Sequence, residues 1–569
     1  MATSAAAPSP DRRRERSLLA LAAGLLVAAV AAVYAQTLGF AWLEWDDRPH
    51  LLENPHLRLG LSAAGLRWAA LGDWYGNWHP LTWLAFLAQR DLFGSDPRGY
   101  HAVSVALHAA NALLLLFALR ALSGRSAESA LVAALFALHP LRVESVAWVS
   151  EQKDLLFAGS GFACLWAWAG YARKPGAARY LLCLALAAGS LLAKPMLVTL
   201  PCLLLLLDYW PLARLEARRL PRLVLEKLPF AALALIAASR ILGLQVDIAP
   251  ELSTWERVGH AGMSYLFYAA KTLWPASLSG FYPHPLLPRT GGIAWTPLEL
   301  AAGLALLAAL AALALARRAH ALVGWLWFLG TLVPVLGFVQ VGKQGFADRY
   351  TYFPQIGLWI ALAFALGDWL RARPDPGRSA RRAAPALAAL LAALALQSGA
   401  QARVWRDSEA LFAHGVALDP RNSVFRYNLA RVLQLEGRGD EALAHYRAVL
   451  AVDPQHGGAL NNLASLLDAR GETRAARALY DQALALEPDS ADLHYNFGNH
   501  LARHGAREAA LREYRRSLAL DAKHLPARIR LGDLLREAGR VRAARAHYER
   551  ALAIDPESAA ARRGLEALR

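Results

Sequence analysis

The chain has 569 residues, and 56% of them are hydrophobic, a high share for a water-soluble protein. Its formal net charge is +16, but Lys and Arg lie in short clusters between apolar runs, which argues against a nucleic-acid-binding protein. The three cysteines lie inside apolar runs without CxxC spacing, so neither a disulfide framework nor a structural zinc site is predicted. A polytopic membrane protein is the class that fits best.

The first apolar run covers residues 17–38. A signal peptide ending near Ala35 is the alternative interpretation, but the apolar core of a signal peptide is typically about 7–15 residues long. Because this run reaches the roughly 20 residues that a membrane span needs, we interpret it as an uncleaved first span.

An acidic pair follows this run, in the segment WDDRPHLLENPHL of residues 45–57. Because Asp46 and Asp47 are adjacent, their side chains point in different directions, and one can face a cavity while Arg or backbone donors hold the other. A carboxylate in a low-dielectric site has a raised pKa and can act as a general base. An acidic turn that flanks a span is the alternative, and the sequence leaves open which aspartate would be the base.

Further apolar runs of spanning length follow as far as residue 400. Together with the first run they give eleven predicted spans, near residues 17–38, 101–122, 128–148, 154–172, 178–193, 196–212, 223–242, 296–316, 321–341, 350–370 and 383–400. The sequence therefore predicts an all-α, polytopic membrane helix bundle over residues 1–400.

Clusters of basic residues give this bundle an orientation, because cytoplasmic loops retain Lys and Arg. The clusters lie at residues 12–16, 173–174, 214–219, 317–318 and 371–382. We interpret residues 259–275 as an amphipathic segment that lies along or dips into the membrane, since a crossing there would move residues 317–318 outside. The loops at 39–100, 149–153, 243–295 and 342–349 and everything beyond residue 400 are then predicted outside.

Ionisable residues at a membrane boundary are costly, so those on the predicted outer side are functional candidates. Beyond the acidic pair they are Arg142, Glu144, Glu151, Lys153, Asp154, Lys194, Lys271, Asp348 and Arg349. The alternative for any one of them is an interfacial anchor or a partner in an ion pair.

A repeat of 34 residues begins near residue 401. Its marks are Asp419-Pro420, Asp453-Pro454, Glu487-Pro488, Asp521-Ala522 and Asp555-Pro556. This period is typical of tetratricopeptide helix pairs, and it gives a half repeat with Phe412 followed by four full repeats over residues 401–569. Such a solenoid presents a concave groove that binds an extended partner.

Three asparagines recur at one position of the first helix of successive repeats. They are Asn428, Asn462 and Asn496. Stacking should align them as a ladder on the concave surface, where amide groups can hold the backbone of an acceptor peptide. The alternative is that each asparagine satisfies a neighbouring group within its own repeat.

Six elements occur in a fixed order: 45-WDDRPHLLENPHL-57, 77-NWHPLTWLAFLAQRDLFGSDPRGYHAVSVALHAANALLL-115, 137-ALHPLRVESVAWVSEQKDLL-156, 205-LLLDYWPL-212, 280-GFYPHP-285 and 347-ADRYTYFP-354. With the repeats downstream, this combination resembles the transmembrane and tetratricopeptide-repeat-containing O-mannosyltransferase family over nearly the whole chain. The resemblance implies a GT-C type glycosyltransferase, which moves mannose or another hexose from a polyprenyl-phosphate carrier to a protein hydroxyl group on the outer face.

The resemblance implies that Asp46 or Asp47 activates the acceptor hydroxyl group. A glycosyl phosphate already carries its leaving group, so cations are needed to hold the departing phosphate. The predicted phosphate-binding residues are Arg349, Lys271, Lys153 and Arg142, and the supporting residues are Glu144, Glu151, Asp154, Asp348 and Tyr350. No metal or other cofactor is predicted, although a divalent cation at the acidic pair is an alternative.

The Ala- and Arg-rich composition suggests a bacterium of high genomic GC content, and therefore a multi-pass protein of the inner membrane with a cytoplasmic N-terminus and periplasmic repeats. Two other functions stay open at this point. One is a periplasmic glycan polymerase or ligase. The other is a non-enzymatic, membrane-anchored repeat scaffold for envelope assembly, which would leave the outer charged residues unexplained.

The orientation can be tested with topology reporters. Because basic loops stay inside, fusions after residues 45, 280, 346 and 450 should report an outside location and fusions after 176, 217, 319 and 377 an inside location. An inside signal at residue 450 would reverse the place of the repeats, and one at residue 280 would mean that residues 259–275 cross the membrane.

Overall fold

The computed structural model of the protein describes residues 10–244, 252–287, 318–338 and 342–569, with a few isolated positions between 296 and 308. Almost all of the regular structure in these ranges is helical, as the sequence predicts. The chain divides into two compact units, Met1–Pro420 and Arg421–Arg569. The helix that contains Phe412, which the sequence assigns to the half repeat, belongs to the first unit.

The first unit is a helix bundle with a single small two-stranded sheet among its described residues. Its helices are α1 (Pro10–Tyr34), α2 (Ala63–Leu71), α3 (Pro80–Phe93), α4 (Pro97–Ser123), α5 (Ser126–Leu138), α6 (Val143–Ala147), α7 (Gln152–Arg173), α8 (Ala177–Ala193), α9 (Leu200–Tyr209), α10 (Leu220–Leu242), α11 (Thr254–Leu273), α13 (Ala319–Leu332), α14 (Gln355–Arg371), α15 (Pro376–Ala402) and α16 (Ser408–Leu418). The strands β1 (Tyr282–Pro283) and β2 (Gln344–Phe346) pair antiparallel.

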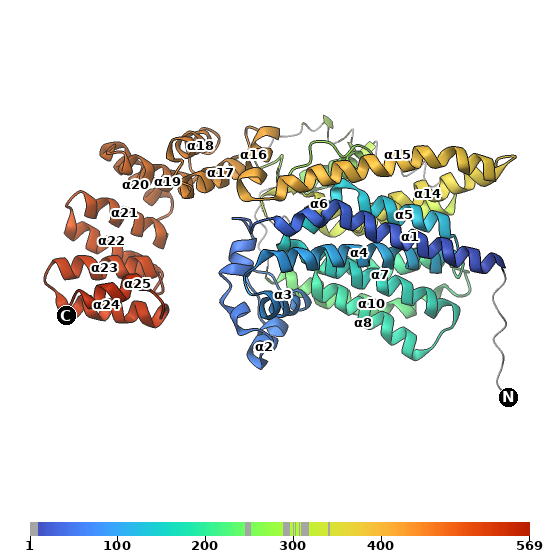
Figure 1. Ribbon diagram of the computed structural model, residues 1–569, viewed down its shortest axis with the longest axis horizontal. Coiled ribbons are helices and arrows are strands. Elements are labelled where there is room, and N and C mark those ends of the chain that lie inside the picture. Colours follow the sequence, from blue (N-terminus) through green and yellow to red (C-terminus); the bar gives the residue numbers. More distant parts are fainter. Residues whose placement is uncertain are drawn as a thin grey trace. The chain divides into compact units, whose positions relative to one another are not determined.

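The long helices of this unit pack side by side. Helix α4 lies between α1 and α7, and α7 packs in turn against α8 (Figure 1). Helices α13 and α14 form another closely packed pair. Large side chains such as Trp168 and Trp327 are fully buried between the helices. The bundle interior is thus filled with apolar side chains, as the composition predicts.

Four described helical segments are long and apolar enough to cross a membrane. They are Arg13–Gly39, Pro97–Ser123, Val149–Arg173 and Pro376–Trp405. Three more apolar helices are shorter, at Ala177–Ala193, Pro195–Tyr209 and Ala319–Val335. Among the described residues, helix length and composition thus support four of the eleven predicted spans, or five if the bent pair Ser126–Leu138 and Pro140–Ala147 is one span. The predicted span at 296–316 lies largely outside the described residues.

The predicted span at 128–148 is a bent pair of helices that together are long and apolar enough to cross a membrane. Helix α5 ends at Leu138, and the chain resumes as a short helical segment from Pro140 to Ala147, bent by 62° from α5. Pro140 lacks the backbone N–H that would continue the hydrogen bonds of α5, so the helix breaks before it. The break places the segment from Arg142 to Glu151 as short helical turns beside the acidic pair.

The predicted amphipathic segment 259–275 falls within helix α11 and the residues just after it. This helix begins after a capping box, in which Ser253 and Glu256 satisfy each other's backbone N–H groups. One face is buried and contains His260, Ser264 and Tyr268. Polar side chains on the buried face fit a helix that packs against protein rather than lipid.

The second unit is a solenoid of helix pairs. Its helices are α17 (Ser423–Leu435), α18 (Gly439–Val452), α19 (Gly457–Ala469), α20 (Thr473–Leu486), α21 (Ala491–Arg503), α22 (Arg507–Leu520), α23 (Leu525–Glu537), α24 (Val541–Ile554) and α25 (Ala559–Glu566). Small residues in the first helix of a repeat make room for a tyrosine of the second: a Cβ at Gly498 would lie 2.7 Å from the Tyr514 ring, and one at Gly532 would lie 2.8 Å from the Tyr548 ring. Each tyrosine therefore packs where a larger residue would not fit.

Candidate functional site

Asp47 fastens its loop to the segment that follows the broken helix. One carboxylate oxygen accepts hydrogen bonds from the Ser150 backbone N–H at 3.0 Å and from the Ser150 hydroxyl at 2.6 Å. The other oxygen accepts from the Leu43 backbone N–H at 3.2 Å. The side chain is buried, and this burial raises the pKa of Asp47 to about 6, although the hydrogen bonds lower it. Asp47 is thus held by protein donors on both oxygens.

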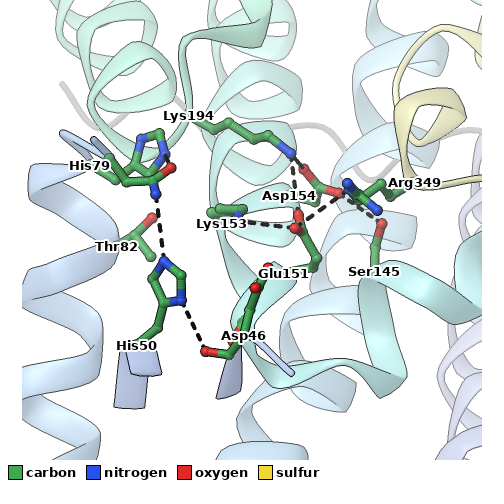
Figure 2. A network of polar contacts seen from close by, with 12 residues as sticks. Asp46, His50, His79, Thr82, Ser145, Glu151, Lys153, Asp154, Lys194 and Arg349 are labelled. Carbon is green, nitrogen blue, oxygen red and sulfur yellow. Dashed lines mark hydrogen bonds and ion pairs between the residues drawn. The ribbon is translucent and has the colours of Figure 1, made fainter. Parts of the chain in front are cut away.

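Asp46 is placed differently. It is half-buried, and among the described residues its carboxylate has no hydrogen-bond or ion-pair partner. Its backbone carbonyl accepts a hydrogen bond from the His50 backbone N–H at 3.0 Å and lies 2.9 Å from Nδ1 of the His50 ring, so the loop itself is fixed. Figure 2 shows the Asp46 side chain pointing from this loop toward a network of charged residues. Asp46 is therefore the member of the pair that is available to a ligand.

Glu151 is the centre of that network. Its carboxylate pairs with Lys153 at 3.1 Å, with Lys194 at 3.2 Å and with Arg349 at 3.5 Å (Figure 2). The three cations come from the start of α7, the residue after α8 and the short turn η9 (Asp348–Thr351). Elements far apart in the sequence thus converge on one buried carboxylate.

Two further carboxylates hold the same cations from other sides. Asp154 pairs with Lys194 at 2.6 Å and accepts a hydrogen bond from the Ser145 hydroxyl at 3.0 Å. Glu144 accepts a hydrogen bond from the Arg349 backbone N–H at 2.8 Å and also pairs with its guanidinium group. We call Glu144, Glu151, Lys153, Asp154, Lys194 and Arg349 the charged cluster. Its three carboxylates and three cations balance in formal charge.

The cations of the charged cluster remain within reach of a ligand. Their side chains are 12–14% exposed, whereas Glu151 is 3% exposed. A ligand that entered from solvent or lipid would therefore meet the cations before the carboxylates. The fixed ion pairs also hold the cations in position before any ligand binds, which lowers the cost of reorganisation.

Two histidines line the loop side of the site. His50 Nε2 lies 3.5 Å from Asn77 Nδ2, and His79 Nε2 lies 3.2 Å from Asn77 Oδ1. Burial, and then the charge of Lys153, lower the pKa of both imidazoles, that of His79 the further. Both rings are thus neutral near pH 7. They provide polar contacts without adding positive charge.

Two residues predicted to bind phosphate lie outside the charged cluster. Arg142 is fully buried and donates to Thr351 Oγ1 at 2.5 Å and to Gln355 Oε1 at 2.8 Å. Lys271 donates to the carbonyl oxygens of Ala276 and Ser277, at 2.6 and 3.2 Å. The structure thus brings Lys153 and Arg349 together but places Arg142 and Lys271 apart from them.

The supporting residues Asp348 and Tyr350 flank Arg349. Asp348 is buried and accepts a hydrogen bond from the Tyr282 hydroxyl at 2.9 Å, and burial raises its pKa well above the usual value. The Arg349 guanidinium lies 5.1 Å from the centre of the Tyr350 ring. Both residues therefore shape the turn that carries Arg349.

Lys194 is the cation that sequence reasoning did not assign to phosphate. It is one of the ionisable candidates at the membrane boundary, but its distance of 40 residues from Asp154 gives no local spacing that predicts their pairing. Lys194 follows an apolar helix and precedes Pro195. A lysine at the end of an apolar helix, directly before a proline, is the signal in the sequence that could have marked Lys194 as a site residue.

The acidic pair does not present two carboxylates to one point. Both oxygens of Asp47 already accept hydrogen bonds from Leu43 and Ser150. A divalent cation at the acidic pair, the alternative named above, would find its open carboxylate oxygens on Asp46.

The predicted asparagine ladder makes contacts inside the second unit. Asn428 Nδ2 donates to the Val424 carbonyl at 2.9 Å, which is the alternative foreseen for it. Asn462 and Asn496 donate instead across repeats, to the Tyr446 hydroxyl at 3.1 Å and to Asn461 Oδ1 at 3.1 Å. All three are half-buried. Their amide nitrogens are thus engaged, and the carbonyl oxygens of Asn428 and Asn496 have no partner among the described residues.

Family models and curated relatives agree with the predicted architecture. Two tetratricopeptide-repeat models match residues 433–495 and 525–558. The human protein named "Protein O-mannosyl-transferase TMTC1" is 27% identical over 519 residues, and "Protein O-mannosyl-transferase TMTC4" of Mus musculus is 26% identical over 438. These alignments cover 78% and 65% of this chain, and 56% and 57% of the relatives.

A third relative, "Protein O-mannosyl-transferase Tmtc1" of Drosophila melanogaster, is 24% identical over 74% of this chain and 60% of its own. The chain therefore spans a little more than half the length of the curated relatives it matches. The resemblance found in the sequence is confirmed, since the homologues are named protein O-mannosyl-transferases.

The contacts of the acidic pair predict different effects on stability. Asp47→Ala leaves two buried N–H groups and a hydroxyl without their acceptor, and an unsatisfied buried group costs about 1–3 kcal/mol. The melting temperature of the purified protein in detergent should therefore fall clearly. Asp46→Ala, the matched control, removes no protein contact and should change it little. Equal melting temperatures for both variants would contradict the anchoring role of Asp47.

Proposed function

We propose that this protein is a membrane-embedded glycosyltransferase that moves mannose or another hexose from a polyprenyl-phosphate carrier to a hydroxyl group of a protein. The observation that carries the proposal is the charged cluster, three preorganised cations beside the carboxylate of Asp46, which has no partner among the residues that the structure describes. The names of the relatives support transfer of a sugar to protein. The lipid-linked donor is inferred from the chemistry of the site.

Asp46 is the general base of the proposed reaction. Its carboxylate takes the proton of the acceptor hydroxyl group while the oxygen attacks the anomeric carbon of the sugar. The bond from that carbon to the phosphate oxygen breaks, and the phosphate leaves with the electron pair. Attack from the side opposite to the phosphate inverts the anomeric centre.

The charge balance of the site favours this step. The charged cluster is neutral in sum, so Asp46 contributes the excess negative charge next to it. When Asp46 accepts the proton, that charge disappears as the leaving phosphate gains one. Lys153, Lys194 and Arg349 stabilise the phosphate because they are already oriented in a poorly solvated site.

The carboxylates of the charged cluster position the cations. Glu151 touches all three, and Glu144 fixes Arg349 through both its backbone and its guanidinium group. Arg142 acts one step further away, because it holds Thr351 and Gln355 on the segment that follows Arg349. In this proposal Arg142 is a positioning residue and does not contact phosphate.

The repeats hold the protein acceptor in this proposal. A solenoid of tetratricopeptide repeats offers a groove for an extended chain. The carbonyl oxygens of Asn428 and Asn496, which have no partner in the described ranges, could accept backbone N–H groups of such a chain. The basic loops support an extracytoplasmic location of the repeats, and the composition supports a bacterial inner membrane.

The base assignment can be tested by transfer assays in nanodiscs. Asp46→Asn removes the base but keeps size and polarity, so kcat should fall by about 10²–10⁴-fold. Asp47→Asn is the matched control, because its amide oxygen can still accept from Ser150, and it should keep most of the activity. Full activity of Asp46→Asn with loss in Asp47→Asn would reverse the roles of the two residues.

The phosphate-binding assignment predicts a defect in donor use. Lys194→Gln and Arg349→Gln each remove one cation from the leaving phosphate, and kcat/KM for the lipid-linked donor should fall by at least tenfold. Lys174→Gln, which changes an exposed lysine after α7, is the control and should retain activity. Unchanged kcat/KM in both cluster variants would remove these cations from the reaction.

If the three asparagines bind the acceptor chain, their loss should affect transfer to protein acceptors but not transfer to small acceptors. Replacing Asn428, Asn462 and Asn496 by Ala should reduce glycosylation of protein acceptors and leave transfer to a small hydroxyl-bearing acceptor in place. Circular dichroism should report whether the repeats stay helical. Equal loss with both acceptors, or no loss with either, would leave the repeats without this role.

A further inference from the structure

A compact group of potential metal ligands lies in the second unit, away from the residues used above. Asp468 belongs to α19, and His500 and His504 lie at the end of α21, one repeat later. One ligand atom from each residue lies within 4.8 Å of the other two. The three side chains therefore meet across the boundary between two consecutive repeats.

Both imidazole rings contact the same carboxylate oxygen of Asp468. Its Oδ1 lies 2.7 Å from Nδ1 of His500 and 2.7 Å from Nε2 of His504. The Asp468 side chain is fully buried, the His500 side chain is 4% exposed, and that of His504 is 36% exposed. The site thus has a fixed interior and one ligand that can be reached from solvent.

Packing fixes the orientation of the buried imidazole. The His500 ring stacks on Phe497 at a centroid distance of 6.1 Å and lies 5.5 Å from the Tyr480 ring. His504 is four residues further along the chain, so both imidazoles lie on one side of the helix end. Two histidines at this spacing with one carboxylate are a ligand set that suits Zn²⁺.

The cluster is not part of the repeat pattern. One repeat before and one after His500, the chain carries Leu466 and Leu534, and around His504 it carries Arg470 and Ala538. The positions that match Asp468 carry Gln434, Ala502 and Arg536. Stacking of the solenoid therefore does not require these three residues.

We propose that Asp468, His500 and His504 bind a divalent transition-metal ion, with Zn²⁺ as the best fit, and that the ion fastens two consecutive repeats to each other. Three protein ligands leave a fourth tetrahedral position for water or for a group of a bound partner. This metal site is independent of the proposed transferase chemistry in the first unit.

The distances require only a small opening. Ligand atoms of a tetrahedral zinc ion lie roughly 3.3 Å apart, because each bond is about 2.0–2.1 Å long. The present nitrogen-to-oxygen distances of 2.7 Å are those of hydrogen bonds. Exposed His504 can move outward to admit the ion. Both histidines must give up the proton that now faces Asp468, so binding weakens as the pH falls.

Arg503 is a built-in competitor for the carboxylate. Its guanidinium donates to Asp468 Oδ2 at 2.6 Å, and its side chain is 54% exposed. A cation at this distance repels a divalent ion. It also draws electron density from the carboxylate that would bind it. Removing this cation should therefore strengthen metal binding, whereas a cluster that serves only as an ion pair would simply lose a contact.

The test uses the full chain in nanodiscs, stripped of metal with EDTA and titrated with Co²⁺, whose visible absorption reports coordination by nitrogen and oxygen ligands. One equivalent should bind and be displaced by Zn²⁺. His500→Ala and His504→Ala should weaken binding by at least tenfold, and Arg503→Ala should tighten it severalfold. His494→Ala is the matched control, because His494 lies on the same helix and its ring, among the described residues, contacts Glu513 and a backbone carbonyl instead of Asp468.

Hydrogen exchange gives a second measurement that does not depend on activity. Zn²⁺ should slow exchange at the ends of α19 and α21 in the unchanged protein and in His494→Ala, but not in His500→Ala. Absence of a bound equivalent, or equal binding by the unchanged protein and by both ligand variants, would overturn the proposal. Circular dichroism of each variant shows whether a loss of binding reflects unfolding.

Discussion

The buried carboxylate of Glu151 is the interaction on which the candidate site depends. Taking a charge out of water costs several kcal/mol unless partners compensate it, and Glu151 is compensated by three cations from separate elements. Removing one partner of a buried pair typically costs about 3–5 kcal/mol. The same pairs that hold α7, α8 and η9 together therefore also fix the positions of the cations. The ion pairs that stabilise this part of the fold are thus the same ion pairs that orient the cations of the proposed phosphate site.

A second constraint divides the acidic pair. The loop from residue 41 onward has to be fastened to the short turns that follow the break at Pro140, and Asp47 does this through Ser150. Because neighbouring side chains diverge, fastening Asp47 leaves Asp46 directed toward the charged cluster. Within the described part of the chain, one aspartate is thus kept without a partner by the structural role of the other. That is the arrangement a general base needs, since its lone pairs must be open to the substrate.

Much of the fold could be predicted from the sequence, because apolar run lengths and the 34-residue period are local signals. Small residues at Gly498 and Gly532 reflect tyrosine packing that any repeat of this kind requires. The break at Pro140 has a local signal, the missing backbone N–H of proline, although the predicted span at 128–148 runs across it. The pairing of Lys194 with Asp154 has no local signal, since it depends on how α7 and α8 pack. Arg142 shows the converse, because an ionisable residue at a membrane boundary can be buried and hold its neighbours, here Thr351 and Gln355, through one guanidinium nitrogen.

In the second unit, residues that recur in every repeat can be compared with residues that occur in one repeat only. Side chains that recur every 34 residues can be explained by stacking, and the amide nitrogens of Asn462 and Asn496 make contacts of this kind. A polar cluster that occurs in one repeat boundary alone has no such explanation. Asp468, buried with three donors, replaces apolar or unrelated residues found at the same position in other repeats. Burying a carboxylate there costs free energy that its three donors offset, and the two histidine donors are the residues that would join Asp468 in binding the proposed metal ion.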